Sequence, residues 1–548
     1  MIASQGSGFD IILISGEPFA DHPLSGAGVI ARVLETKGYK IGIVSQPDWI
    51  KNENFLKLGK PRLFFGVTSG SIDSLLVNYT ALKRARGRDP HAPHRSRMPD
   101  RAVLVYCNKV KQLFPGVPVV IGGIEASLRR FAHYDYWEDR VRRSILLDSR
   151  ADILVYGPGE LQAIEIARRL KAGEDLNGIP GTCVIRTDLP PGFGQLPTYQ
   201  EVNENKDKFC EAQNLFSNRR PLAQRYSGRF VLQYPMPAYT PADLDWIFGL
   251  PYSREIPEDF PEFEMARFSV VTHRGCVGQC SFCSLSLHQG DKIVSRSEES
   301  ILAEIRRLTQ HPDFKGYIDD LGGPTANMYG MDCESPCDSE CLSCPELDRT
   351  HRRLIRLMRK ARAIPGIKKV FVRSGIRHDL ALGSPEYIKE LSDHHISGLL
   401  KIAPEHVSPR VLRLMNKGTE SLEEFRRLFY KFNRGRKQHL KYYFMVAHPG
   451  TTEKEARELA HAVRKLEKEG EKPVEGVQIF TPTPMTRSTC MYYTGKDPVT
   501  GEIVLVPRAF EEKKKQRQML ANPDLPGING SILDKMSSRG KKRRGDPI

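Results

Sequence analysis

Short apolar runs alternate with amphipathic stretches through the first third of the chain. Five of these runs have the length and composition of buried strands, because each is short and almost wholly apolar. The stretches between them, such as 26–38 and 159–170, carry apolar residues at helical spacing. This alternation predicts an α/β fold with a doubly wound parallel sheet. The predicted strands are 10–15, 40–45, 62–68, 117–122 and 151–156.

The same alternation returns after residue 266, with six further strand and helix units. Six such units fit a partial TIM-type barrel, (β/α)6, in which the chemistry lies at the carboxyl ends of the strands. Each predicted strand ends in a polar or glycine-rich turn, as expected where functional groups gather. The predicted strands are 268–271, 316–323, 369–373, 398–403, 440–446 and 476–480.

The residues between and after these two patterns are less regular. The range 185–265 is rich in proline, asparagine and charge, which favours a linker packed over a domain junction. The end of the chain is basic and contains glycine and serine, which is typical of a disordered tail, and 511–517 is predicted to be a solvated helix. The predicted divisions are a Rossmann-like domain at 1–184, a linker at 185–265, a barrel at 266–490 with an insertion at 333–344, and an extension at 491–548.

The charge of the chain is strongly positive. Its 548 residues carry 82 Lys and Arg against 66 Asp and Glu, a net charge of +16. This balance admits nucleic acid as a partner, although a solvated basic surface is the simpler explanation. No run reaches the roughly 18 apolar residues of a membrane span, and the N-terminus lacks the pattern of a secretion signal. We therefore expect a cytoplasmic protein without a membrane partner.

The cysteines are concentrated in one window. Seven of the eleven fall between Cys276 and Cys344, where even spacing would place one or two. In a chain without a secretion signal, such clustering favours metal binding over disulfides. The other four cysteines, Cys107, Cys183, Cys210 and Cys490, are predicted to be ordinary thiols.

The first cysteine group follows the apolar run 268–271 directly. Cys276, Cys280 and Cys283 have the spacing C-x3-C-x2-C. Three thiolates in one short loop can hold three corners of an iron–sulfur cluster and leave the fourth iron open to a cofactor. The alternative is a zinc site with His273 as the fourth ligand.

The second cysteine group places four thiols within twelve residues. They can close around one metal, either as an auxiliary iron–sulfur cluster or as a structural zinc that folds the insertion. A third interpretation is that these thiols bind nothing. The group consists of Cys333, Cys337, Cys341 and Cys344.

The three-cysteine loop, with the aromatic Phe282 before its last cysteine, resembles the cluster signature of radical S-adenosylmethionine (radical SAM) enzymes. Longer strings resemble the YgiQ-type radical SAM family, and the resemblance runs from about residue 10 to about residue 515. It implies a 4Fe-4S cluster and S-adenosylmethionine as cofactors, but it names no substrate. The strings are 14–17, 21–23, 42–49, 122–130, the three-cysteine loop, 401–406 and 480–485.

The resemblance also implies roles for individual residues. Cys276, Cys280 and Cys283 would ligate the cluster. Gly322 and Gly323 resemble the Gly-Gly-Glu motif whose backbone meets the methionine amino group, although proline replaces the acidic residue here. Glu405, at the end of the fourth barrel strand, is by its position a candidate acceptor for the ribose hydroxyls. A one-electron reductase such as flavodoxin or ferredoxin is the expected partner.

The upstream sheet resembles the cobalamin-binding-type domain that precedes many radical SAM barrels. The cobalamin-ligating motif D-x-H-x-x-G is absent, because the nearest string, 21–26, has the wrong spacing between aspartate and histidine. Cobalamin is therefore doubtful.

Two classes of function stay open at this stage. The first is a radical SAM enzyme that functionalises a C–H bond, for example by methylation or methylthiolation. The second is a zinc-bearing RNA-binding protein without catalysis, and a radical SAM enzyme that modifies RNA would combine the two.

Overall fold

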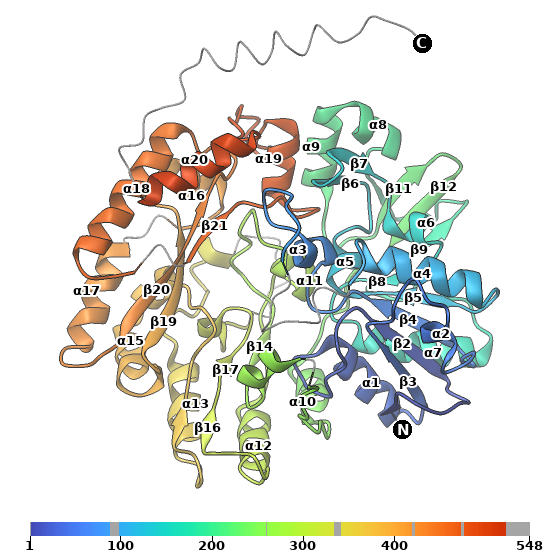
Figure 1. The fold of residues 1–548 in the computed structure, drawn as a ribbon, viewed down its shortest axis with the longest axis horizontal. Helices are drawn as coiled ribbons and strands as arrows, with labels where there is room; N and C mark the ends of the chain where they lie inside the picture. Colours follow the sequence, from blue (N-terminus) through green and yellow to red (C-terminus); the bar gives the residue numbers. More distant parts are fainter. Residues whose placement is uncertain are drawn as a thin grey trace, which may run out of the picture.

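The computed structural model describes residues 2–87, 98–258, 260–333, 341–418, 422–472 and 476–521. Two α/β halves lie side by side, an N-terminal sheet with its helices and a C-terminal barrel (Figure 1). The predicted fold class is confirmed in both halves.

The N-terminal sheet contains all five strands predicted for it. They pair in parallel in the order β3-β2-β4-β5-β8, and the short β1 adds to the outer edge of β3. Buried parallel strands are apolar on both faces, so these strands appear in the sequence as continuous apolar runs. Their bounds are Ile2–Ala3 (β1), Ile11–Ser15 (β2), Ile41–Ser45 (β3), Phe64–Thr68 (β4), Val119–Ile121 (β5) and Ile153–Val155 (β8).

Helices cover both faces of this sheet, as in a doubly wound fold. Helices α1 and α7 pack on one face, and α4 and α6 pack on the other. The hydroxyl of Ser25 accepts the N–H of Gly28 and so begins α1 at the carboxyl end of β2. The helices are Gly26–Thr36 (α1), Ala102–Leu113 (α4), Ile145–Ser149 (α6) and Glu160–Ala172 (α7).

The range predicted as a linker contributes regular structure to the sheet. Strands β9, β12 and β11 continue it in antiparallel pairing beyond β8, and β10 ends it. Residues 185–265 are therefore largely an extension of the N-terminal half. The elements are Thr182–Arg186 (β9), Gly194–Gln195 (β10), Tyr199–Glu204 (α8), Lys206–Leu215 (α9), Leu222–Tyr226 (β11), Arg229–Gln233 (β12) and Pro241–Gly249 (α10).

The C-terminal half is the predicted partial barrel. Its strands follow one another in the order β13, β17, β18, β19, β20 and β21, joined by parallel ladders or single backbone hydrogen bonds. Their bounds are Val270–Val271, Leu321–Gly322, Lys369–Val370, Leu399–Glu405, His439–Val446 and Val477–Ile479. The outer helices are Glu298–Leu308 (α12), Arg352–Arg362 (α13), Pro385–Glu390 (α15), Leu422–Phe432 (α17) and Glu453–Lys468 (α18).

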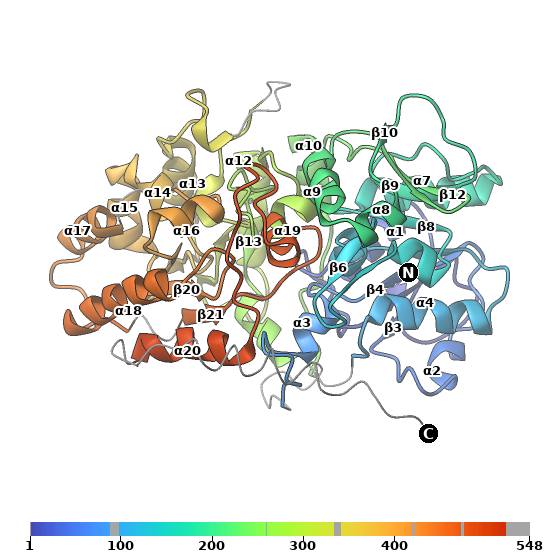
Figure 2. The same cartoon turned by 90° about the horizontal axis from the view of Figure 1, so that it is seen from above.

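The C-terminal extension binds the two halves together. Helix α19 (Arg487–Thr494) lies against α9 of the N-terminal half, and α20 (Phe510–Ala521) packs along α18 of the barrel (Figure 2). The side chain of Gln516 on α20 accepts the N–H of Ala447 at 2.8 Å and so supports the end of β20. The prediction of a solvated helix at 511–517 was wrong, because one face of α20 is buried.

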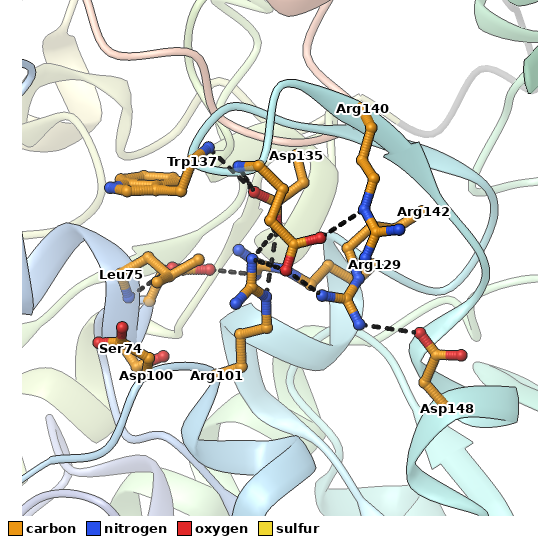
Figure 3. Close-up of polar contacts among 12 residues, drawn as sticks. Ser74, Leu75, Asp100, Arg101, Arg129, Asp135, Trp137, Arg140, Arg142 and Asp148 are labelled. Atoms are coloured by element: carbon orange, nitrogen blue, oxygen red, sulfur yellow. Dashed lines mark hydrogen bonds and ion pairs between the residues drawn. The ribbon is translucent and has the colours of Figure 1, made fainter. Parts of the chain in front are cut away.

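A network of buried charges fixes the segment that follows β5. Arg101 donates to Asp135 at 2.8 Å (Figure 3), and Arg129 forms an ion pair with Asp73. Burial alone would raise the pKa of Asp135, but the positive charge of Arg101 and a backbone hydrogen bond hold it at about 2. The string 122–130, which carried part of the family resemblance, thus contains an arginine that stabilises the fold.

Lys513 is a buried cation on α20 without a carboxylate partner in the described structure. Its ammonium donates to the hydroxyls of Tyr136 at 2.9 Å and Tyr492 at 3.2 Å, and the side chain is 0% exposed. Burial, together with the charges of Lys83 and Arg508, lowers the pKa of Lys513 to about 8. The folded chain therefore holds this proton less tightly than the unfolded chain does.

We expect Lys513→Met to stabilise the protein at neutral pH. Because the folded pKa lies below the ordinary value of 10.5, the penalty is complete below pH 8 and fades as the pH rises to 10.5. That penalty is at most about 3 kcal/mol, and losing the tyrosine hydrogen bonds should leave a net gain of about 1–2 kcal/mol at pH 7. Thermal midpoints of variant and wild type between pH 7 and pH 10 check this.

Lys514→Met, on the same helix, controls for the loss of one positive charge. A stability difference between Lys513→Met and wild type that stays constant from pH 7 to pH 10 would contradict the expectation.

Candidate active site

The three-cysteine loop begins where the first barrel strand ends. His273 and Arg274 form β14 and pair with β15 (Val294–Ser295) in antiparallel register. The N–H of Cys276 donates to the carbonyl of Gly290 at 3.1 Å, which anchors the start of the loop. Gly275, between the strand and the first cysteine, has φ = 87°, a conformation that favours glycine.

The thiols of the loop are largely withdrawn from solvent. Cys276 is 8% exposed, and Cys280 and Cys283 are partly buried. A Cβ built on Gly278 would lie 3.3 Å from the sulfur of Cys276 and 3.7 Å from that of Cys280, so both sulfurs border this residue. Burial raises the pKa of Cys280, and it raises that of Cys283 to about 12. Burial therefore favours the neutral thiols. Bound iron would favour the thiolates instead, because metals take thiolates as ligands.

The donor set fits an iron–sulfur cluster, which is held by cysteine thiolates. Zinc requires four ligands gathered tightly around one ion. Among the described residues, no three His, Cys, Asp or Glu side chains gather in that way. Nδ1 of His273, the predicted fourth zinc ligand, lies 2.9 Å from the hydroxyl of Thr272, and its buried Nε2 has no hydrogen-bond partner among the described residues. A four-iron cluster is larger than one ion, so its three thiolates stand farther apart.

The second cysteine group lies close to the first. Cys341 is buried in an apolar cluster that also contains Cys276 and Met331. Cys333 and Cys344 are partly exposed, and Cys337 lies outside the described residues. A metal bound by this group stays a prediction.

Two cysteines predicted to be ordinary thiols lie side by side. The sulfur of Cys490 on α19 is 3.8 Å from that of Cys210 on α9. A hydrogen bond from Cys490 lowers the pKa of Cys210 to about 7. No disulfide forms among the ten cysteines within the described ranges.

A cavity of about 450 Å³ lies where the N-terminal sheet meets the barrel. The sheet contributes four loops that follow its parallel strands, which is where ligands of doubly wound folds bind. The structure places all four loops on one cavity. The loop residues that line it are Ser15, Glu17, Gly70, Ser71, Gly122, Gly123, Gly157 and Gly159.

The barrel side of the cavity contains Gly322 and Gly323 at the end of β17. A Cβ on Gly322 would lie 3.0 Å from the hydroxyl of Ser374, and one on Gly323 would lie 2.5 Å from the ring of His273. These glycines leave no room for a side chain, so their backbone forms the wall of the cavity.

Glu405 lies on the cysteine side of the barrel mouth. Its charge acts on Cys280 and Cys283, and it has φ = 66° at the end of β19. Burial raises the pKa of Glu405, which the positive charges of Lys417 and Arg377 partly offset. No hydrogen bond or ion pair joins its carboxylate to another described residue. Left-handed backbone and a raised pKa together are typical of functional sites.

His22, in the string nearest to a cobalamin motif, is buried and hydrogen-bonded within the protein. It is 0% exposed, its Nε2 lies 2.9 Å from the carbonyl of Arg267, and its Nδ1 accepts the N–H of Leu24 at 3.0 Å. Both ring nitrogens are therefore engaged, in agreement with the absence of the D-x-H-x-x-G spacing.

Two residues near the loop were not predicted from the sequence. His288, on α11 (Leu285–Gln289), lines the cavity, and its Nδ1 lies 3.0 Å from the hydroxyl of Ser127 in the N-terminal half. Arg377 places Nη1 3.6 Å from the sulfur of Cys280. The one sequence signal for His288 is its position just after the cysteine loop. The sequence carries no comparable signal for Arg377.

Comparison with known proteins agrees with this geometry. The family description "Radical SAM N-terminal" matches residues 1–271, "Radical SAM superfamily" matches 270–463, and "Domain of unknown function (DUF3362)" matches 475–525. A UPF0313 protein of Methanosarcina mazei is 44% identical over 93% of this chain and 91% of its own length. One from Methanocella arvoryzae is 45% identical over 94% and 91%.

The chain belongs to the UPF0313 family, the YgiQ-type radical SAM proteins. It is therefore an enzyme of the radical SAM superfamily, whose members use a [4Fe-4S] cluster and S-adenosylmethionine and need a reductant. This membership does not support the alternative of a zinc-bearing RNA-binding protein without catalysis.

Solved structures share the two-part fold at low sequence identity. The radical SAM methyltransferase TsrM from Kitasatospora setae, with cobalamin and a [4Fe-4S] cluster bound, superposes with a TM-score of 0.55. It is 17% identical, and the match covers 95% of this chain and 91% of TsrM. OxsB with aqua-cobalamin and S-adenosylmethionine bound gives a TM-score of 0.51 at 12% identity, over 98% and 69%. Within the described ranges, no helix is long and apolar enough to cross a membrane.

Proposed function

We propose that Cys276, Cys280 and Cys283 hold a [4Fe-4S] cluster and that the enzyme reductively cleaves S-adenosylmethionine to functionalise a C–H bond. When bound and reduced, the cluster supplies the electron that splits S-adenosylmethionine into methionine and a 5′-deoxyadenosyl radical. One observation carries the proposal. His273 and Arg274, which lead into the cysteine loop, line a cavity onto which the carboxyl ends of both sheets open, and the sulfur of Cys276 lies 3.6 Å from the hydroxyl of Thr325, two residues after Gly323.

The residues around the cluster have distinct roles in this proposal. The backbone of Gly322 and Gly323, which lines the cavity and carries no side chain of its own, receives the methionine amino group. The unpaired carboxylate of Glu405 accepts hydrogen bonds from the ribose hydroxyls. The walls of the cavity exclude water, which protects a radical from side reactions.

The substrate and the electron donor belong to the same proposal. The substrate enters the cavity between the halves, and a flavodoxin or ferredoxin delivers the electron. A cytoplasmic location is part of the same proposal. RNA stays one substrate class to test, and the basic tail at 537–545 lies outside the described residues. Cobalamin ligated by His22 is not part of the proposal.

Anaerobic reconstitution with iron and sulfide tests this function. The wild type should bind about four irons per chain and, with dithionite, should release 5′-deoxyadenosine from S-adenosylmethionine. Cys276→Ala should abolish the release, because a cluster held by two thiolates is not retained. Measurement of iron, sulfide and 5′-deoxyadenosine on the same samples decides the outcome.

Cys183→Ala is the matched control, since Cys183 is a buried thiol of the N-terminal sheet. Cleavage that survives Cys276→Ala, or wild type that purifies with zinc in place of iron, would refute the proposal.

A further inference from the structure

Arg377 is a buried arginine beside the cysteine loop. It follows β18 and precedes α14 (His378–Leu382), and it is 6% exposed. Its Nη1 lies 3.6 Å from the sulfur of Cys280, within the range of a hydrogen bond to sulfur. An arginine is charged at any ordinary pH, so this contact brings a permanent positive charge against a cysteine of the loop.

The guanidinium is held in place by its neighbours. Its Nε donates to both carboxylate oxygens of Asp379, at 3.0 and 3.1 Å, and its Nη2 also contacts that carboxylate. The backbone is fixed as well, because Oδ1 of the buried Asn327 accepts the N–H of Arg377 at 2.9 Å and its Nδ2 donates to the carbonyl at 3.0 Å. The group is therefore positioned before any ligand binds.

The cysteine loop is shaped to receive this group. A Cβ on Gly278, midway between Cys276 and Cys280, would lie 2.7 Å from Nη1 of Arg377. Glycine at this position lets the guanidinium lie directly over the loop. The charge of Lys417 lowers the pKa of Cys280 more than the charge of Arg377 does, but the ammonium of Lys417 donates to the carbonyl of Ala403 at 2.6 Å, and only Arg377 donates a hydrogen bond to this sulfur among the described residues.

We propose that Arg377 is a positioning residue that donates a hydrogen bond to the Cys280 thiolate and raises the reduction potential of the cluster. The inference rests on the proposed function, because it assumes that Cys280 ligates iron. Reduction adds one negative charge to the cluster, and a nearby positive charge with an N–H donor stabilises that state in a site with little water. Arg377 thereby eases electron transfer from the reductase.

A different role would leave a different signature. If Arg377 instead bound the carboxylate of S-adenosylmethionine, its replacement would weaken binding of that molecule and leave the potential of the cluster alone unchanged. Potentials are therefore measured without S-adenosylmethionine, and its affinity is measured separately.

The test is a redox titration of the reconstituted protein, followed by electron paramagnetic resonance. Relative to wild type, Arg377→Gln should lower the equilibrium constant for reduction about tenfold, which is about 59 mV for one electron. Arg377→Lys keeps the charge and should give a smaller shift. Lys417→Gln is the matched control for a nearby charge without a bond to sulfur, and it should shift the potential less than Arg377→Gln does.

Arg377→Lys also serves as the second variant if Arg377→Gln fails to fold, because it keeps the charge beside Asp379 but loses the guanidinium N–H aimed at the sulfur of Cys280, so the potential should still fall. An unchanged potential in both Arg377→Gln and Arg377→Lys, or in whichever of them folds, with a cluster that still cleaves S-adenosylmethionine, overturns the inference alone. A wild type without a [4Fe-4S] signal overturns the proposed function together with it.

Discussion

Replacing Gly275 with alanine is expected to destabilise the protein and to abolish iron binding by the cysteine loop. A Cβ on Gly275 would lie 1.8 Å from the carbonyl oxygen of Lys292, and φ is 87°. A backbone oxygen cannot rotate away as a side chain can, so β14 and β15 must separate and displace Cys276. We expect a loss of about 3–4 kcal/mol, at the upper end for a single substitution.

Thermal unfolding of the apo-protein and iron content after reconstitution measure the two effects. Gly38→Ala is the control, because φ is 84° there and a Cβ meets nothing within 4 Å. It should cost about 1–2 kcal/mol from the left-handed backbone alone and leave the iron content at the wild-type value. Normal iron binding by Gly275→Ala would contradict the structure of the loop.

Arg129→Met should destabilise the N-terminal half by about 3–5 kcal/mol, the usual result of removing one partner from a buried ion pair. Arg129 is 3% exposed and forms an ion pair with Asp73, which is 2% exposed. The wholly buried Glu125 also depends on this cation, because burial and the charge of Asp73 raise its pKa while Arg129 opposes the rise. Without Arg129, the buried carboxyl groups of Asp73 and Glu125 lose the cation that stabilises their charge.

Urea denaturation, followed by circular dichroism, measures this loss. Arg140→Met is the matched control, since Arg140 pairs with Glu138 in the same region but its side chain is 65% exposed. Surface pairs contribute less than about 1 kcal/mol, so the control should stay close to wild type. Equal losses in the two variants would mean that burial is not what makes Arg129 important.

The strands of both halves could be predicted because buried parallel strands appear as continuous apolar runs. Strands β10, β11 and β12 were missed for a physical reason. Strands β11 and β12 pair in antiparallel register, and the exposed Arg225 and Arg229 interrupt their apolar pattern, while β10 has only two residues. The prolines around them mark connections, and the sequence alone does not separate connections from a linker.

The cysteine loop could be identified because its three candidate ligands are close together in the sequence, at a characteristic spacing. The rest of the site depends on contacts between distant parts of the chain. Arg377 meets Cys280 across 97 positions, and His288 meets Ser127 across 161. The pairing of Cys210 with Cys490, 280 positions apart, is equally invisible in the sequence. Burial of one face of α20 likewise depends on packing against α18, which local composition does not encode.

Both halves of the chain contribute walls to the cavity. Ligand binding is therefore coupled to the free energy of separating the two halves. A ligand that contacts both walls must leave before the halves can separate. Each tenfold rise in its concentration above the dissociation constant then adds about 1.4 kcal/mol to the free energy of parting them. The ligand-bound enzyme should accordingly resist proteases at its domain junction better than the ligand-free enzyme. Screening small molecules for this protection offers a way to find the substrate without knowing the reaction.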